Sequence, residues 1–133
     1  MEDCIFCKIA NGEIGKLIYE NEYVAAFDDL NPQAPVHSLV VPKKHIMNIE
    51  DLNFCDHNVE NNEEKAENCE KEKSCDGRYI KEIFKAIKEV AKIKGISEKG
   101  YRVISNCGND AGQTVMHLHF HIIGGQELGE KIV

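Results

Sequence analysis

Apolar residues recur every three or four positions between Arg78 and Lys94. This is the period of a helix that buries one face and exposes the other. Gly95 follows the pattern directly, as expected of a residue that ends a helix. We therefore predict one long amphipathic helix over 78–94, whose buried stripe consists of Ile80, Ile83, Phe84, Ile87, Val90 and Ala91.

Shorter apolar runs predict strands, of which the first two form a hairpin around Asn21-Glu22. The predicted strands span residues 17–20, 23–27, 37–41, 101–105 and 115–123. A short apolar pattern over 4–10 predicts a second, shorter helix that ends at Asn11-Gly12. About five strands with one long and one short helix indicate an α+β fold with a largely antiparallel sheet.

The chain has 133 residues, which is the size of a single domain, and we assign 1–133 to one domain. Its apolar runs are only a few residues long, so we expect no membrane partner. The start, Met1-Glu2-Asp3-Cys4, lacks the basic and apolar regions of a signal peptide. Together with six cysteines, this predicts a cytoplasmic protein whose thiols are free or bound to metal.

The acidic net charge of −7 is concentrated in one segment. Residues 50–77 contain ten acidic and three basic residues, whereas the rest of the chain is neutral. Because this segment is also poor in apolar residues, we predict a flexible acidic insertion at about 55–76. It is either a spacer or a surface for protein partners, and Cys55, His57, Cys69 and Cys75 lack the spacing of a second metal site. The absence of a basic excess argues against a nucleic-acid partner.

Three histidines alternate with apolar residues between 117 and 123. On a strand, alternate side chains share a face, so His117, His119 and His121 would lie together. Imidazole is costly to bury without a partner, so packing alone does not explain such a row. We predict a functional site, with the opposite face turned to the core through Met116, Leu118, Phe120 and Ile122.

Two chemistries suit this row: zinc binding, or nucleophilic and acid–base catalysis. The preceding loop, residues 106–114, is polar and contains glycine, and by itself it is typical of an ordinary hairpin turn. Its backbone amides and the side chains of Asn106, Gln113 and Thr114 can also hold an anion such as phosphate. Beside the histidines this favours phosphoryl chemistry, with a zinc hydrolase that uses all three histidines as ligands as the alternative.

Residues 117–123 resemble the signature of the histidine triad family, His-φ-His-φ-His-φ-φ with φ apolar. Residues 4–15, 26–46 and 112–125 are similar to the nucleotide-binding branch of that family. Residues 33–45 and Gly124-Gly125 resemble its phosphoramidases more than its dinucleoside polyphosphate hydrolases. The nucleotidylyltransferase branch has glutamine at the third histidine, where this chain has His121.

The resemblance implies a homodimer in which the sheet continues from one subunit into its partner. It implies a hydrolase of purine nucleoside 5′-phosphoramidates that releases AMP or GMP without a catalytic cofactor. The reaction would pass through a covalent nucleotidyl-histidine intermediate, which divides one displacement into two easier ones. A dinucleoside polyphosphate hydrolase and a nucleotide-binding scaffold with incidental turnover are the alternatives.

The resemblance also assigns roles to individual residues. His119 would be the nucleophile, His121 would contact the phosphate, and His37 would be a candidate proton relay. Asp29 would accept hydrogen bonds from both ribose hydroxyls. The phosphate and leaving group would be bound by Asn106, Gly112, Gln113 and Thr114, and the base by Ile14, Phe27 and Leu30, for which plain core packing is the alternative.

Cys4 and Cys7 have the spacing of a structural zinc motif, although paired free thiols and a redox motif share that spacing. In similar family members, the site is completed by the histidine of a Pro-Lys-x-His motif and by the first triad histidine. Here these are His45 and His117. We expect a structural zinc ion on these four residues, which leaves His119 and His121 for catalysis.

Overall fold

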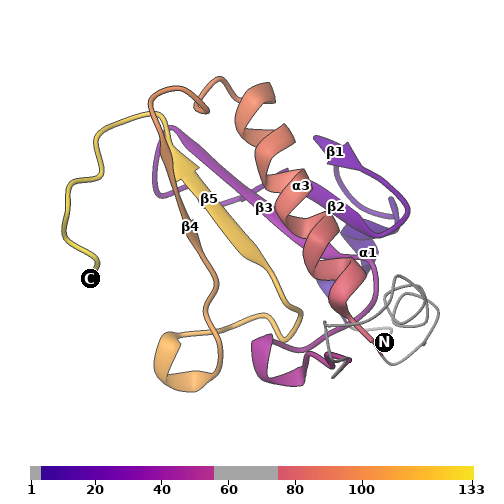
Figure 1. Ribbon diagram of the computed structural model, residues 1–133. Helices are drawn as coiled ribbons and strands as arrows, with labels where there is room; N and C mark the ends of the chain where they lie inside the picture. The colour runs from indigo at the N-terminus through magenta and orange to yellow at the C-terminus, as the bar shows by residue number, and fades with distance from the viewer. Residues whose placement is uncertain (1–3, 56–74) are drawn as a thin grey trace, which may run out of the picture.

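The computed structural model describes residues 4–55 and 75–133, which form a five-stranded antiparallel sheet with a helix on each face (Figure 1). The strands lie in the order β1-β2-β3-β5-β4, and β4 is therefore an edge strand. Strands β3 and β5, which carry candidate histidines, are neighbours. The strands are β1 (Tyr19–Glu20), β2 (Val24–Asp28), β3 (Val36–Pro42), β4 (Tyr101–Ile104) and β5 (Phe120–Gly124). The predicted α+β class is confirmed.

The long helix α3 (Gly77–Ile93) packs mainly over β1, β2 and β3, and Figure 1 shows it crossing in front of the sheet. The short helix α1 (Ile5–Ala10) packs on the other face. Two single turns of 3-10 helix, η1 (Ile49–Asp51) and η2 (Asn109–Ala111), lie in the connections. Both predicted helices are present within a residue or two of their expected bounds.

Alternation along the strands divides the side chains between two cores. On β2, Val24 and Ala26 pack with α3, whereas Ala25 and Phe27 pack with α1. Leu39 of β3 lies in the α1 core, so His37, two residues earlier, points to the same face. His121 pairs in register with Leu39, which brings both histidines to the α1 face.

The last strand is shorter than predicted, because β5 begins at Phe120 and not at residue 115. The preceding residues are held by bonds to the last residue of β3 and to the segment that follows it, outside the regular ladder. Leu118 N–H donates to the carbonyl of Ile46 at 2.6 Å, and His117 Nε2 lies 2.8 Å from the carbonyl of Pro42. His117 and His119 therefore precede the strand, and only His121 lies on it.

Two predicted core positions are wrong. Met116 is exposed, because it lies in the irregular segment before β5, while Leu118, Phe120 and Ile122 are buried as predicted. Phe84 lies at the margin of the apolar stripe of α3 and is 51% exposed. Its ring packs edge-on against Phe120 with the centroids 5.8 Å apart.

Asp76 marks where the body of the domain resumes after the predicted insertion. Its side chain is 1% exposed and accepts hydrogen bonds from Lys44 Nζ at 2.6 Å and from the Asn53 amide at 2.9 Å. The Asp76 amide in turn donates to the Asn53 carbonyl at 2.7 Å. Asp76 thus belongs to the folded body at the end of the insertion predicted at about 55–76, and residues 56–74 lie outside the described residues. Among the described helices, none has the length and apolar character needed to cross a membrane.

Candidate active site

A cavity of about 550 Å³ opens on the α1 face of the sheet. Eight of the predicted site residues line it: Ile14, Phe27, Asp29, Leu30, His37, Thr114, His119 and His121. Leu30 is 88% exposed, so it is a rim residue and not part of the core. Asn106, Gly112 and Gln113 lie in the loop before the triad but are not among the lining residues.

Gln113 is buried, and its side-chain amide makes four hydrogen bonds. It donates to the carbonyls of Met47 at 2.8 Å and Val115 at 3.1 Å. It accepts from the Gly108 amide at 2.9 Å and from Asn48 Nδ2 at 3.3 Å. These bonds use the hydrogen-bonding capacity of the amide, so in this arrangement the side chain of Gln113 holds the loop in place. Its predicted phosphate contact stays a prediction.

His119 is buried beside the cavity, and its protonation is determined by one short contact. Its Nδ1 lies 2.6 Å from the main-chain carbonyl of His117. Because a carbonyl oxygen can only accept, Nδ1 carries the proton and Nε2 keeps its lone pair. Burial lowers the pKa of His119, which favours the neutral ring. A neutral imidazole with a free Nε2 lone pair is a competent nucleophile.

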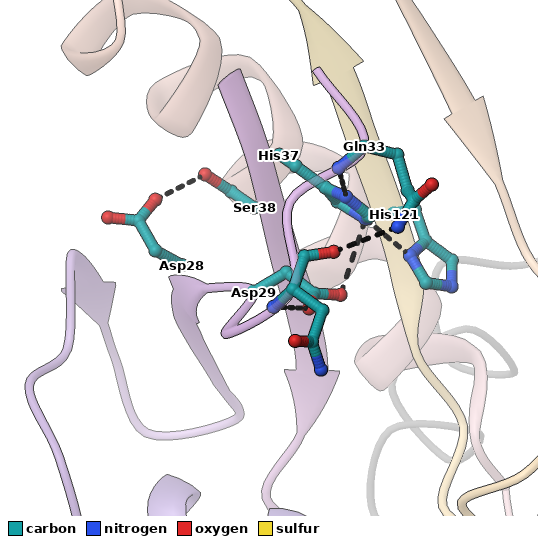
Figure 2. Close-up of polar contacts among 7 residues, drawn as sticks. Asp28, Asp29, Gln33, His37, Ser38 and His121 are labelled. Carbon is teal, nitrogen blue, oxygen red and sulfur yellow. Dashed lines mark hydrogen bonds and ion pairs between the residues drawn. The ribbon is translucent and has the colours of Figure 1, made fainter. Parts of the chain in front are cut away.

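His121 and His37 both line the cavity, and Figure 2 shows their rings beside each other. His37 Nε2 is 2.8 Å from His121 Nδ1 and 3.4 Å from Asp29 Oδ2. The Gln33 amide donates to His37 Nδ1 at 3.0 Å. Burial, with added repulsion from His119 and His37, lowers the pKa of His121 to about 4. His121 is therefore neutral at physiological pH.

Two adjacent carboxylates at the end of β2 face different groups. Asp28 is engaged by Ser38 Oγ at 2.9 Å and by Lys94 Nζ at 2.8 Å, which ties α3 to the sheet. Asp29 instead directs Oδ2 toward His37, while its Oδ1 accepts from the Asn31 amide at 2.8 Å. Figure 2 shows the two carboxylates on opposite sides of β3. The carboxylate of Asp29 is thus the one that belongs to the histidine cluster.

Behind the cavity, Cys4, Cys7, His45 and His117 bring four metal-ligand atoms within 4.8 Å of one another. Cys4 Sγ and Cys7 Sγ lie 3.3 and 3.4 Å from His117 Nδ1, and Cys7 Sγ lies 3.3 Å from His45 Nδ1. His117 Nε2 donates to the Pro42 carbonyl, so its Nδ1 lone pair faces the thiols. Two sulfur and two nitrogen donors, with a carbonyl that orients one imidazole, fit a tetrahedral zinc ion.

Burial has opposite effects on the charged forms of these ligands. It raises the pKa of Cys7 to about 11, with a further contribution from Cys4, and thus disfavours the thiolate. It lowers the pKa of His117 to about 4 and so favours the neutral ring that metals bind. A divalent cation is the group that would stabilise two partly buried thiolates at this position.

The three triad histidines do not converge on one point. His117 faces the thiols, whereas His121 faces His37 and Asp29. The His119 ring lies 5.1 Å from that of His121, and its Nδ1 is occupied by the His117 carbonyl. This division argues against a single zinc ion held by all three.

The sequence pattern did not identify several residues of the cavity. Phe6 lies between the two cysteines on α1, and its ring packs edge-on against His119 with the centroids 5.0 Å apart. Gln33 lies in a proline-containing loop and contributes its backbone amide, which no side-chain motif can reveal. The other unpredicted lining residues include Ile5, Ile9, Lys16, Leu39 and Val115.

Comparison with known proteins agrees with this geometry. The HIT domain model matches residues 12–128. A HIT-like protein of Azospirillum brasilense is 40% identical over 129 residues, which cover 96% of this chain and 90% of the relative. The purine nucleoside phosphoramidase of Escherichia coli K12 is 36% identical over 132 residues, with 98% and 94% of the two chains covered.

Solved structures of histidine triad proteins are also similar to this chain. A HIT family hydrolase from Clostridium thermocellum is 44% identical and superposes with a TM-score of 0.77, covering 100% of this chain and 99% of its own. A histidine triad protein from Clostridium difficile is also 44% identical, with a TM-score of 0.78 and coverage of 98% and 97%. The chain belongs to the histidine triad (HIT) family.

Proposed function

We propose that this protein hydrolyses purine nucleoside 5′-phosphoramidates, with His119 as the nucleophile. The observation that carries the proposal is the 2.6 Å contact from His119 Nδ1 to the His117 carbonyl. It leaves Nε2 of a neutral, buried imidazole as the reactive nitrogen beside the cavity. The similarity to a relative named purine nucleoside phosphoramidase supports the choice of substrate.

The proposed reaction has two displacements at the α-phosphorus. In the first, His119 Nε2 forms a bond to phosphorus, the bond to the amine nitrogen breaks, and the amine leaves with one added proton. In the second, water attacks phosphorus and gives up one proton, and the bond to Nε2 breaks with its electron pair returning to the ring. The nucleoside monophosphate is released, and the proton taken up in the first step is returned in the second.

The cavity offers complementary groups for each part of such a nucleotide. The base would lie against Phe27 and the exposed Ile14 and Leu30, and the α1 residues would extend this apolar wall. Asp29, as a carboxylate, would accept from the ribose hydroxyls. His121 and Thr114 line the same cavity and would contact the phosphate. The loop beside the cavity contains Asn106, Gly112 and Gln113, whose predicted contacts with the phosphate and the leaving group stay predictions.

Cys4, Cys7, His45 and His117 would hold one zinc ion. When bound, the ion would supply structural stability by joining α1 to the segments around His45 and His117. The support is the donor set and its spacing within 4.8 Å. No step of the proposed hydrolysis uses this ion, because the reacting phosphorus would lie beside His119, on the cavity side of the triad.

A homodimer is supported by the exposed edge of the sheet. Strand β4 has a neighbour on one side only, and Val103 in its middle is partly exposed. Phe84 of α3 adds a large exposed apolar side chain. An unpaired edge strand can pair with a second copy, so we propose that the two subunits join through β4. We also propose a cytoplasmic location, because Cys4, Cys7 and Cys107 form no disulfide, which suits a reducing environment.

The substrate class is tested by direct competition. The purified protein would be given equal concentrations of adenosine 5′-phosphoramidate and diadenosine tetraphosphate, and the products would be followed by chromatography. We expect the phosphoramidate to be consumed with a kcat/KM at least about 100-fold higher, a difference of about 2.7 kcal/mol in transition-state stabilisation. Preferential consumption of the dinucleotide would assign the protein to the alternative activity.

A further inference from the structure

We propose that the main-chain amide of Gln33 fixes the positions of the ring protons on His37 and His121. His37 is then a positioning residue, and His121 is a neutral hydrogen-bond donor toward the cavity. This assignment differs from the predicted role of His37 as a proton relay. It rests on the proposed function for its catalytic meaning, although the proton positions themselves do not depend on any substrate.

The proton of the neutral His37 ring is fixed by a main-chain contact. The Gln33 amide donates to His37 Nδ1 at 3.0 Å, so this nitrogen must present a lone pair. The proton of the neutral ring is therefore on Nε2. The surroundings of Nε2 agree, because it lies 3.4 Å from Asp29 Oδ2, and an ionised carboxylate can only accept.

The proton position of His37 determines that of His121. His37 Nε2–H lies 2.8 Å from His121 Nδ1, which must accept. In the neutral ring of His121 the proton is then on Nε2, the nitrogen left for whatever fills the cavity. His121 and His119 both line that cavity. His121 would present an N–H group, which can donate to a phosphate oxygen. His119 would present a lone pair, which can attack phosphorus.

A relay would require His37 to gain or lose a proton during the reaction. A proton gained at Nδ1 would oppose the N–H group of Gln33. A proton lost from Nε2 would leave a buried imidazolate anion beside the carboxylate of Asp29. Neither state fits the contacts, so the protons stay in place. The lowered pKa of His121, about 4, is consistent with a ring that does not take up an extra proton.

The amide of Gln33 also disfavours a cation at this cluster. Asp29, His37 and His121 place three possible ligand atoms within 4.8 Å of one another. Coordination through His37 Nε2 would move its proton to Nδ1, where the amide of Gln33 already donates. The cluster therefore favours fixed hydrogen bonds over metal binding, although its residue types suit a metal.

The proton positions are measured directly by 15N NMR of the full-length protein with labelled histidine. We expect His37 and His121 as Nε2–H tautomers and His119 as the Nδ1–H tautomer. Addition of zinc or manganese to the zinc-saturated protein should leave the His37 and His121 signals in place. An Nδ1–H tautomer or a charged ring at His37, or metal-induced shifts at these two histidines, would overturn the assignment.

Two substitutions test the catalytic consequence. His37→Gln places an amide N–H near the position of Nε2 but cannot relay protons, whereas His37→Leu removes the donor. We expect the glutamine variant to retain at least about ten times the kcat of the leucine variant. Equal loss in both variants would favour a relay. Failure of the wild type to cleave phosphoramidates would contradict the proposed function alone, because the NMR result stands without a substrate.

Discussion

The main-chain carbonyl of His117 lies 2.6 Å from Nδ1 of His119. The same His117 directs its side-chain Nδ1 toward Cys4 and Cys7. One residue thus joins the predicted zinc site to the candidate nucleophile. Phe6, between the two cysteines on α1, packs against the His119 ring and provides a second link. Changes at the thiols should therefore be detected at His119.

The zinc site gives the first prediction. Protein purified without chelator should contain about one zinc ion per chain, and Cys7→Ser should lose it. Because metal binding would contribute to folding, the variant should melt at least about 10 °C lower. Its kcat should also fall, since His117 would no longer be held in place. Elemental analysis and thermal unfolding measure these effects.

Cys107→Ser is the matched control, because Cys107 is a free thiol outside the four-residue cluster. This variant should keep both the metal and the melting temperature. Zinc near zero in the wild type, or an equal loss of zinc from both variants, would contradict the assignment of the ligands.

Stability should depend on pH through His121. Its pKa is about 4 in the folded protein and near 6.5 in the unfolded chain, so the unfolded state binds more protons between these values. The contribution of neutral His121 to the free energy of unfolding is complete above pH 6.5 and is lost as the pH falls toward 4. Urea unfolding at several pH values should show this decline, and His121→Gln should show a shallower one. Parallel curves of stability against pH for the wild type and His121→Gln would contradict this role of His121.

The contacts of Asp76 predict which part of the acidic segment is dispensable. Replacing residues 56–74 by a short Gly-Ser linker should leave folding and turnover unchanged, because Asn53 and Asp76 already meet. Asp76→Ala should instead reduce the free energy of unfolding by about 2 kcal/mol, since it leaves Lys44 and the Asn53 amide without their partner. Chemical denaturation measures both changes.

Lys43→Gln is the control for the charge change. Lys43 pairs with Glu20 at the exposed surface, and such pairs contribute less than about 1 kcal/mol. A large destabilisation by the deletion, or a negligible one by Asp76→Ala, would show that the boundary of the body is misplaced.

The edge strand predicts the oligomeric state. Light scattering during gel filtration should give about twice the 15.0 kDa chain mass for the wild type. Val103→Asp should shift the protein toward the monomer, because it places a charge in the middle of the β4 edge. Ile49→Asp, at another exposed apolar residue in η1, should remain dimeric. A monomeric wild type would refute pairing through β4.

The fold was largely predictable because apolar residues recur with a clear period along its helices and strands. The long helix has a 3.6-residue stripe, and the strands end at Pro42 and at Gly124-Gly125. The start of β5 was not predictable, since residues 115–119 have the alternation of a strand. Tertiary bonds from His117 to Pro42, at the end of β3, and from Leu118 to Ile46, beyond it, replace the ladder there.

The site was predictable where side-chain types carry the chemistry. The four proposed zinc ligands and His37, His119 and His121 all fall in clusters that the motifs indicated. Contributions from the backbone were not predictable. The Gln33 amide and the Pro42 carbonyl act through atoms that every residue possesses, and only the folded chain reveals them.

Turnover of adenosine 5′-phosphoramidate by the wild type and by His119→Ala tests the account most directly. Removal of the nucleophile should abolish formation of the covalent intermediate, so we expect kcat/KM to fall at least about 10,000-fold. Circular dichroism would verify that the variant is folded. Wild-type hydrolysis with this loss is the predicted result, and rates within about tenfold of each other would contradict the assignment of His119 as the nucleophile.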